Sequence, residues 1–136
     1  MIVVDTTVLV YATGRDHPLQ QPAIAALQAF RDGEEVGTTT PEVIQEFAHV
    51  RARRLGRLGV ADVATAYARL LRPLEVVTEE HLGIGLALWD DLDTLGTFDA
   101  VLAGVAITHG AELLSADRAF AQVPGLRFRP LHEWPR

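Results

Sequence analysis

The sequence predicts an α/β fold, arranged as three α/β/α layers around a central parallel sheet of four to five strands. Short β-branched or apolar runs alternate along the chain with longer helical segments, the pattern of parallel strands joined by helical crossovers. The chain has 136 residues, of which 49% are hydrophobic and 22% charged. This length and composition suit one globular domain, so we expect residues 1–136 to form a single domain.

The predicted elements follow from apolar periodicity and from residues that begin or end helices. The predicted strands cover residues 2–4, 36–39, 74–78, 112–115 and 126–128. A first helix begins at Thr6, and the further predicted helices cover residues 21–31, 41–55, 60–71, 79–92 and 97–109. Thr40 followed by Pro41 is typical of a helix start, whereas Gly33 and Gly110 follow predicted helix ends.

The composition excludes several classes of function. No apolar run reaches the roughly 20 residues that span a bilayer, and the N-terminus lacks a basic leader, so we expect a cytoplasmic protein without membrane association. The absence of cysteine rules out disulfides, thiolate metal ligands and cysteine nucleophiles. All twelve basic residues are arginine. Mechanisms that require a lysine are therefore excluded.

Two aspartates directly follow predicted strands. Asp5 comes after strand 2–4, and Asp117 comes shortly after strand 112–115. In parallel sheets ligands bind beyond the carboxyl ends of the strands, so both residues are candidates for a functional site. Each could equally cap a following helical turn, a common role of aspartate.

Two further acids lie on predicted helices. Glu46 is roughly 60° around its helix from the apolar Val43, beside a stripe that includes Phe47 and Val50. A glutamate at the edge of a buried face needs a partner such as a cation, unless it reaches solvent. Asp99 lies in the first turn of an apolar helix, where the helix dipole alone could explain it. Four acids at one sheet edge would repel each other without Mg²⁺ or Mn²⁺.

Three segments of the chain, together with its total length, resemble the PIN-domain nucleases, and among them the VapC-type toxins of type II toxin–antitoxin systems. These segments are IVVDTTVLVYA, TTTPEVIQEFAHV and TFDAVLAGVAITHGAELLSAD. The resemblance implies a PIN-like fold and a Mg²⁺-dependent endoribonuclease, with Mn²⁺ as a substitute. It also implies an RNA substrate, a cognate antitoxin protein, a homodimer and a toxin–antitoxin hetero-oligomer.

The resemblance also implies roles for individual residues. Asp5 and Asp99 are expected to bind Mg²⁺ directly, Glu46 to position water, and Asp117 to complete this site or a second one. The expected products carry a 5′-phosphate and a 3′-hydroxyl. Thr7 and Ser115 resemble the polar residues that brace the two strand-end aspartates. Thr7 departs from the serine or asparagine that is common at its position, but it keeps the hydroxyl.

Arginines are candidates for RNA binding. The net charge of −6 opposes binding of a polyanion, so binding would depend on a local basic surface. A cluster lies near the end of the helix that carries Glu46, and two more arginines lie near the strand-end aspartates: Arg51, Arg53, Arg54, Arg57, Arg15 and Arg118. The cluster could bind phosphates or simply complement the helix dipole.

Other functional classes fit the residues less well. Phospho-aspartyl phosphatases and receiver domains need a lysine, which is absent. A serine hydrolase would need a G-x-S-x-G turn, and Ser115 is the only serine. Gly83 and Gly85 lack the remaining spacing of a dinucleotide-binding motif. The alternatives that stay open are a housekeeping PIN nuclease that processes RNA or acts on DNA, and a PIN module that binds RNA without cutting it.

Overall fold

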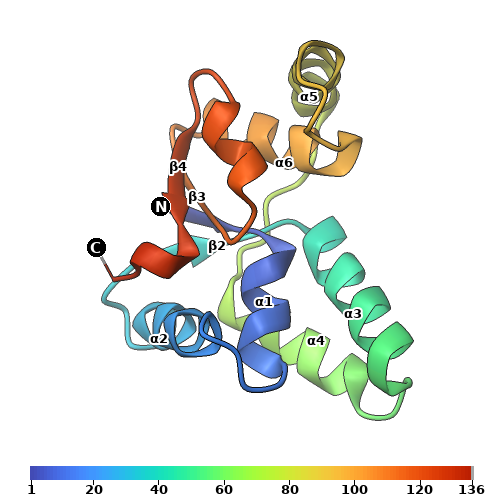
Figure 1. Ribbon diagram of the computed structural model, residues 1–136, viewed down its shortest axis with the longest axis vertical. Helices are drawn as coiled ribbons and strands as arrows, with labels where there is room; N and C mark the ends of the chain where they lie inside the picture. The colour runs from blue at the N-terminus through green and yellow to red at the C-terminus, as the bar shows by residue number, and fades with distance from the viewer. Residues whose placement is uncertain (136) are drawn as a thin grey trace.

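The computed structural model describes residues 1–135 and consists of one sheet surrounded by helices (Figure 1). The strands are β1 (Ile2–Val4), β2 (Gly37–Thr38), β3 (Glu112–Ser115) and β4 (Arg127–Pro130). The α-helices are α1 (Thr6–Thr13), α2 (Gln20–Arg31), α3 (Pro41–Leu55), α4 (Val60–Leu70), α5 (Glu79–Asp91) and α6 (Thr97–Thr108). Short 3₁₀ turns are η1 (Arg118–Gln122) and η2 (Leu131–Glu133).

The sheet has the order β2-β1-β3-β4, and all of its strand pairs are parallel. Helices α1 and α2 lie below the sheet in Figure 1, and α5 and α6 lie above it. Strand β1 is completely buried, as expected for a parallel strand covered on both faces. The α/β class predicted from the sequence is confirmed. Because β1 and β3 are adjacent and parallel, the residues that follow them meet at one sheet edge.

The predicted strand at residues 74–78 is wrong, so the sheet has four strands, the lower end of the predicted range of four to five. This segment makes one backbone hydrogen bond to the chain that follows β2, from Glu75 N to Thr39 O at 2.9 Å. Val76 is 71% exposed and contributes little to a buried face. Just before the segment, Thr38 Oγ1 of β2 donates a side-chain hydrogen bond to Pro73 O at 2.9 Å. The segment is β-branched, but it lacks the ladder that defines a strand.

Helix α3 begins and ends where the sequence predicts. The side chain of Thr40 accepts a hydrogen bond from Val43 N at 3.3 Å, and Pro41 occupies the first turn. Gly56 ends the helix with a φ of +83°, a conformation that favours glycine. The buried side chains of Val43 and Phe47 anchor the helix to the core. Glu46 is thereby held at the edge of that buried face.

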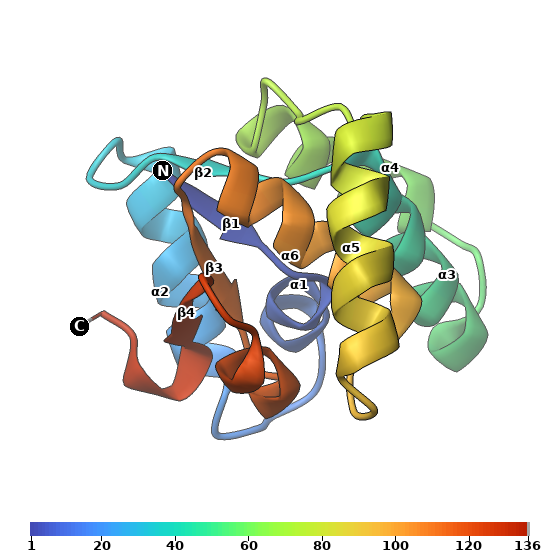
Figure 2. The same ribbon diagram turned by 90° about the horizontal axis from the view of Figure 1, so that it is seen from above.

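Helices α5 and α6 pack against each other at two glycines. A Cβ atom at Gly85 would lie 2.6 Å from the Cα of Val101, and one at Gly104 would lie 2.9 Å from the carbonyl oxygen of His81. The backbones can approach this closely only because both side chains are absent. Figure 2 shows α5 lying across α6 on the outside of the molecule. Gly85 therefore serves helix packing, and α6, which carries Asp99, is held in place.

The C-terminal segment closes the core on the α2 side. Leu131 is completely buried, and the guanidinium of Arg129 lies 4.3 Å from the centroid of the Trp134 ring. That ring meets Phe30 of α2 edge to face, with centroids 6.0 Å apart. Within residues 1–135, none of the helices is both long enough and apolar enough to cross a bilayer.

Candidate metal centre

Asp5 lies between β1 and α1, and its carboxylate is held by three donors. The side chain is the N-cap of α1, and the residue is only 2% exposed. Its Oδ2 atom accepts hydrogen bonds from Ser115 Oγ at 2.6 Å, from Thr7 Oγ1 at 2.8 Å and from Thr7 N at 3.4 Å. Each hydroxyl has one proton and gives it to Asp5. The orientation of the carboxylate is therefore fixed from two sides.

The two hydroxyls are themselves positioned by the backbone beyond β3. Thr7 Oγ1 accepts from Ala116 N at 3.0 Å, and Ser115 Oγ accepts from Asp117 N at 2.9 Å. Asp117 in turn caps η1, because its Oδ1 atom accepts from Ala119 N at 2.9 Å. Asp5 and Asp117 thus perform the capping role open to each of them and still lie near the same sheet edge.

The structure brings the four predicted acids close enough to influence each other. The pKa of Asp99 is raised to about 7, chiefly by burial and then by the negative charges of Asp5, Asp117 and Glu46. The pKa of Asp5 is also raised by burial, against the opposing effect of its hydrogen bonds from Ser115 and Thr7. None of the ion pairs formed within residues 1–135 includes any of these four acids. Their mutual repulsion is therefore not offset by a basic side chain.

The donor set is suited to a hard divalent cation. Carboxylate and hydroxyl oxygens are the ligands that Mg²⁺ and Mn²⁺ prefer, and no thiolate exists in the chain. In the described part of the chain, no three acidic or histidine side chains already converge on one point closely enough to hold an ion. Asp5 is fixed by its donors, so closure around an ion would require the other acids to turn toward it.

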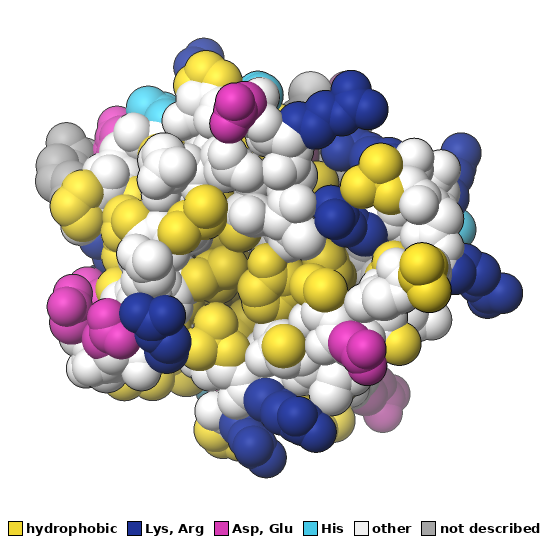
Figure 3. All heavy atoms as spheres, turned by 90° about the horizontal axis from the view of Figure 1, so that it is seen from below, with side chains coloured by type: hydrophobic (Ala, Val, Ile, Leu, Met, Phe, Trp, Pro, Cys, Tyr) yellow, Lys and Arg dark blue, Asp and Glu magenta, His cyan; other side chains and the backbone are white. Residues whose placement is uncertain are grey.

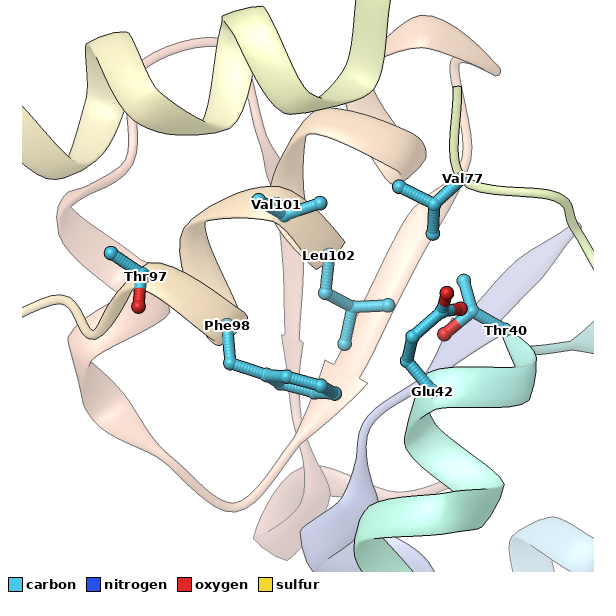
Figure 4. Close-up of a pocket in the computed structure, with 7 residues that line it drawn as sticks. All are labelled: Thr40, Glu42, Val77, Thr97, Phe98, Val101 and Leu102. Atoms are coloured by element: carbon cyan, nitrogen blue, oxygen red, sulfur yellow. The ribbon is translucent and has the colours of Figure 1, made fainter. Parts of the chain in front are cut away.

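A cavity lies beside the acids, between the starts of α3 and α6. It has a volume of about 280 Å³ and is lined by Thr40, Glu42, Val77, Thr97, Phe98, Val101 and Leu102. Figure 4 shows the Phe98 ring and Leu102 facing Glu42 across this space. Phe98 precedes Asp99 on α6, and Glu42 is one turn before Glu46 on α3. This side of the acids is therefore apolar and negatively charged.

A larger hollow of about 510 Å³ lies between α1, the loop that follows it and the second half of α3. We call it the basic groove, and its lining residues are Val10, Tyr11, Gly14, Arg15, Asp16, His17, Phe47, Val50, Arg51, Arg54 and Leu55. Three of the six candidate arginines line the groove and three do not. Arg53 is exposed near the end of α3, Arg57 is exposed in the turn that follows the helix, and Arg118 is exposed in η1. Sequence reasoning missed the groove residues Tyr11 and His17, which show no periodic pattern.

A third hollow is lined mainly by hydrophobic side chains, together with Gln28 and Arg31. It has a volume of about 270 Å³ and lies between α1, α2 and α4, with Leu27, Tyr67 and Leu70 among its lining residues. Figure 3 shows the molecule from below, where hydrophobic side chains gather in a hollow with arginine side chains around it. Exposed apolar hollows of this kind are surfaces that protein segments can cover.

Comparison with known proteins gives the family. The model of the PIN domain family matches residues 2–126. Ribonuclease VapC7 from Mycobacterium tuberculosis is 45% identical over 129 residues, which cover 90% of this chain and 86% of that protein. The chain belongs to the PIN-domain family and, within it, to the VapC group. Ribonuclease VapC13 from the same organism is 30% identical over 93% of this chain and 98% of that protein.

Solved structures support the same fold for this VapC-group chain. A chain in the crystal structure of VapBC2 from Rickettsia felis, bound to a DNA fragment from its promoter, superposes with a TM-score of 0.76. The match covers 96% of this chain and 98% of that one, at 16% identity. A toxin–antitoxin complex from Klebsiella pneumoniae gives a TM-score of 0.69 at 20% identity, covering 93% and 95% of the two chains. The PIN-like fold predicted from the sequence is confirmed.

Proposed function

We propose that this protein is a Mg²⁺-dependent endoribonuclease that acts as the toxin of a toxin–antitoxin pair. The observation that carries the proposal is the set of four acids, Asp99 and the three that raise its pKa, which repel each other and belong to none of the ion pairs among residues 1–135. Membership of the VapC group supports the choice of RNA, because the relatives are named ribonucleases. Retention of all four acids favours a cutting enzyme over a PIN module that only binds RNA.

Asp5 and Asp99 are the proposed direct ligands of the ion. Asp5 presents a carboxylate whose Oδ2 atom is already held by Thr7 and Ser115, so a cation can be bound with little loss of side-chain entropy. The pKa of Asp99 is raised first by burial and then by repulsion from the other three acids, and a divalent cation would relieve that repulsion. Mn²⁺ has the same preference for oxygen and is expected to substitute.

Hydrolysis of a phosphodiester requires an activated water, relief of negative charge on the phosphate and stabilisation of the leaving oxygen. A divalent ion held by carboxylates supplies all three. Glu46 is half-buried on α3 and is proposed to orient the attacking water by accepting its hydrogen bond. Asp117 completes the acidic ring from the β3 side. The expected products have a 5′-phosphate and a 3′-hydroxyl.

The proposed toxin role requires an antitoxin that holds the enzyme inactive. The apolar hollow between α1, α2 and α4 offers surface that a segment of such a protein could cover. Co-expression with the product of a neighbouring small gene should give a stable complex with reduced RNA cleavage. A homodimer is also proposed, and sedimentation that finds only monomers at micromolar concentration would exclude it.

Substitution of the proposed ligands tests the nuclease. Asp99→Asn and Asp5→Asn each remove charge with little change in volume, so each should abolish Mg²⁺-dependent RNA cleavage while the far-ultraviolet circular dichroism stays unchanged. Asp91→Asn is the matched control, because Asp91 is an exposed acid at the end of α5. Parent-level cleavage in either ligand variant would contradict the proposed site.

A further inference from the structure

The basic groove combines three arginines with apolar and aromatic walls. Arg15 and Arg54 are exposed at its edge, and Arg51 is half-buried. Arg51 Nη1 donates to the carbonyl oxygen of Thr13 at 2.9 Å, which fixes its guanidinium at the end of α1. The guanidinium has further N–H groups that can face a ligand. Asp16 also lines the groove, so its three arginines and one aspartate leave two net positive charges there. In a chain of net charge −6, this local positive charge marks a place for an anion.

One wall of the groove is a pair of rings. The Tyr11 ring and the His17 imidazole have centroids 4.6 Å apart and planes inclined by 33°. Val50 of α3 is half-buried and adds apolar surface to the lining, and the completely buried Phe47 lies beneath it. A flat heterocyclic base could lie against such a wall, since base–aromatic stacking tolerates any base sequence. Phosphates alone would leave this apolar surface unused.

The groove is aligned with the acids along α3. Glu42, Glu46, Val50 and Arg54 follow at intervals of four residues, so each lies one turn further along α3 and about 40° further around it. Glu42 lines the cavity of Figure 4, Glu46 belongs to the acidic centre, and Val50 and Arg54 line the basic groove. A polyanion that crosses the acids therefore meets negative charge on one side and positive charge on the other.

We propose that the basic groove is a subsite for one unpaired nucleotide of a single-stranded RNA, with its base against Tyr11 and its phosphates on Arg15 and Arg54. The choice of RNA as the ligand rests on the proposed function. The groove and its lining residues are observed independently of that proposal. The volume of about 510 Å³ lies in the range of small-ligand sites. A paired base is stacked inside a duplex and cannot enter, so the subsite selects unpaired RNA next to the point of cleavage.

Charge-matched double variants test the phosphate contacts. Binding of a labelled single-stranded RNA of about ten nucleotides is measured by fluorescence anisotropy in the Asp99→Asn background, across a series of salt concentrations. The first double variant combines Arg15→Gln and Arg54→Gln, and the control combines Arg53→Gln and Arg57→Gln. Each removes two charges, but the first should weaken binding about tenfold more than the control. Loss of two phosphate contacts to a single strand should also reduce the salt slope by about 1.4. Equal effects of the two pairs would overturn the subsite.

Ring variants test the stacked base. Tyr11→Leu keeps the apolar bulk but removes the ring, and it should weaken binding of the single strand by about fivefold or more. Tyr11→Phe should restore it, and binding of a duplex of the same sequence should not change in either variant. Thermal melting checks that the variants remain folded. Parent-level binding of the single strand by Tyr11→Leu would overturn the stacking role.

Failure of this proposal can be distinguished from failure of the proposed function. The binding assay needs no cleavage, so it reports on the groove even if the acids do not cut RNA. Conversely, metal-dependent cleavage can be present while the groove variants bind RNA like the parent. If those variants bind RNA normally but lose binding to an antitoxin, the groove is a protein site and the nucleotide proposal is wrong.

Discussion

Ser115 Oγ donates a hydrogen bond of 2.6 Å to Asp5 Oδ2, which joins two residues 110 positions apart in the sequence. The contact follows from strand register. Val4 of β1 pairs with Leu114 of β3, and the residues that come directly after this pair are Asp5 and Ser115. A hydroxyl therefore stands at the end of one strand beside a carboxylate at the end of the other. The adjacent parallel strands thus build the fixed part of the candidate metal centre.

Replacing Ser115 by alanine should damage both stability and activity. The hydrogen bond from Ser115 lowers the pKa of the buried Asp5 carboxyl, so its loss should raise that pKa further. Asp117 N also loses its acceptor. Hydrogen bonds to charged groups contribute about 2 kcal/mol, and we expect the free energy of unfolding in urea to fall by about this amount. Cleavage should fall about 10- to 100-fold through misplacement of Asp5.

Thr108→Ala is the control for this hydroxyl deletion. Thr108 Oγ1 donates to Gly104 O within its own helix at 2.9 Å, and the residue is exposed. Its loss should change the free energy of unfolding by no more than about 0.5 kcal/mol. If Ser115→Ala behaves like Thr108→Ala, the hydroxyl has no positioning role at Asp5.

Binding of Mg²⁺ should weaken as the pH falls below 7. The pKa of Asp99 is raised to about 7, so at lower pH the ion must displace a proton from this carboxyl. For release of one proton, the apparent affinity should fall about tenfold from pH 8 to pH 6. Titration calorimetry at several pH values measures the change. In Asp99→Asn the affinity should be weaker and nearly independent of pH over this range, and a flat profile in the parent would contradict the prediction.

Sequence reasoning located the acids because their positions follow from local patterns. Strand ends, helix caps and an apolar stripe are encoded by neighbouring residues, so Asp5, Asp117 and Glu46 could be singled out. Residues 74–78 were misassigned because a β-branched run does not reveal whether a neighbouring strand offers a ladder. Only the tertiary structure separates the candidate arginines that line the basic groove from those that do not. Tyr11 and His17 meet across the turn after α1, and no spacing in the sequence indicates that contact.

Asp99→Asn should stabilise the metal-free protein at high pH. An unfolded aspartate loses its proton near 3.8, whereas folded Asp99 keeps its proton to about pH 7. The folded state therefore binds more protons between these values, and stability falls as the pH rises through this window. Above pH 7 the Asp99 carboxyl is charged in the folded protein, so burial and repulsion lower the stability of the folded state by their full amount. The Tm of Asp99→Asn should exceed that of the parent by a few degrees at pH 8 with chelator, with a small difference near pH 4. A lower Tm at pH 8 would indicate a structural role for the charge.

Two glycines of α5 should respond in opposite ways to the same substitution. A Cβ atom at Gly85 would lie 2.6 Å from the Cα of Val101, and backbone cannot yield as a flexible side chain can. Gly85→Ala should therefore separate α5 from α6 and lower the free energy of unfolding by about 1 to 3 kcal/mol, despite the better helix propensity of alanine.

At the exposed Gly83 a Cβ would meet nothing within 4 Å. Gly83→Ala should raise stability by up to about 1 kcal/mol through propensity alone. Urea unfolding of the two variants separates packing from propensity, and equal shifts of the same sign would show that α5 and α6 are not in close backbone contact in solution.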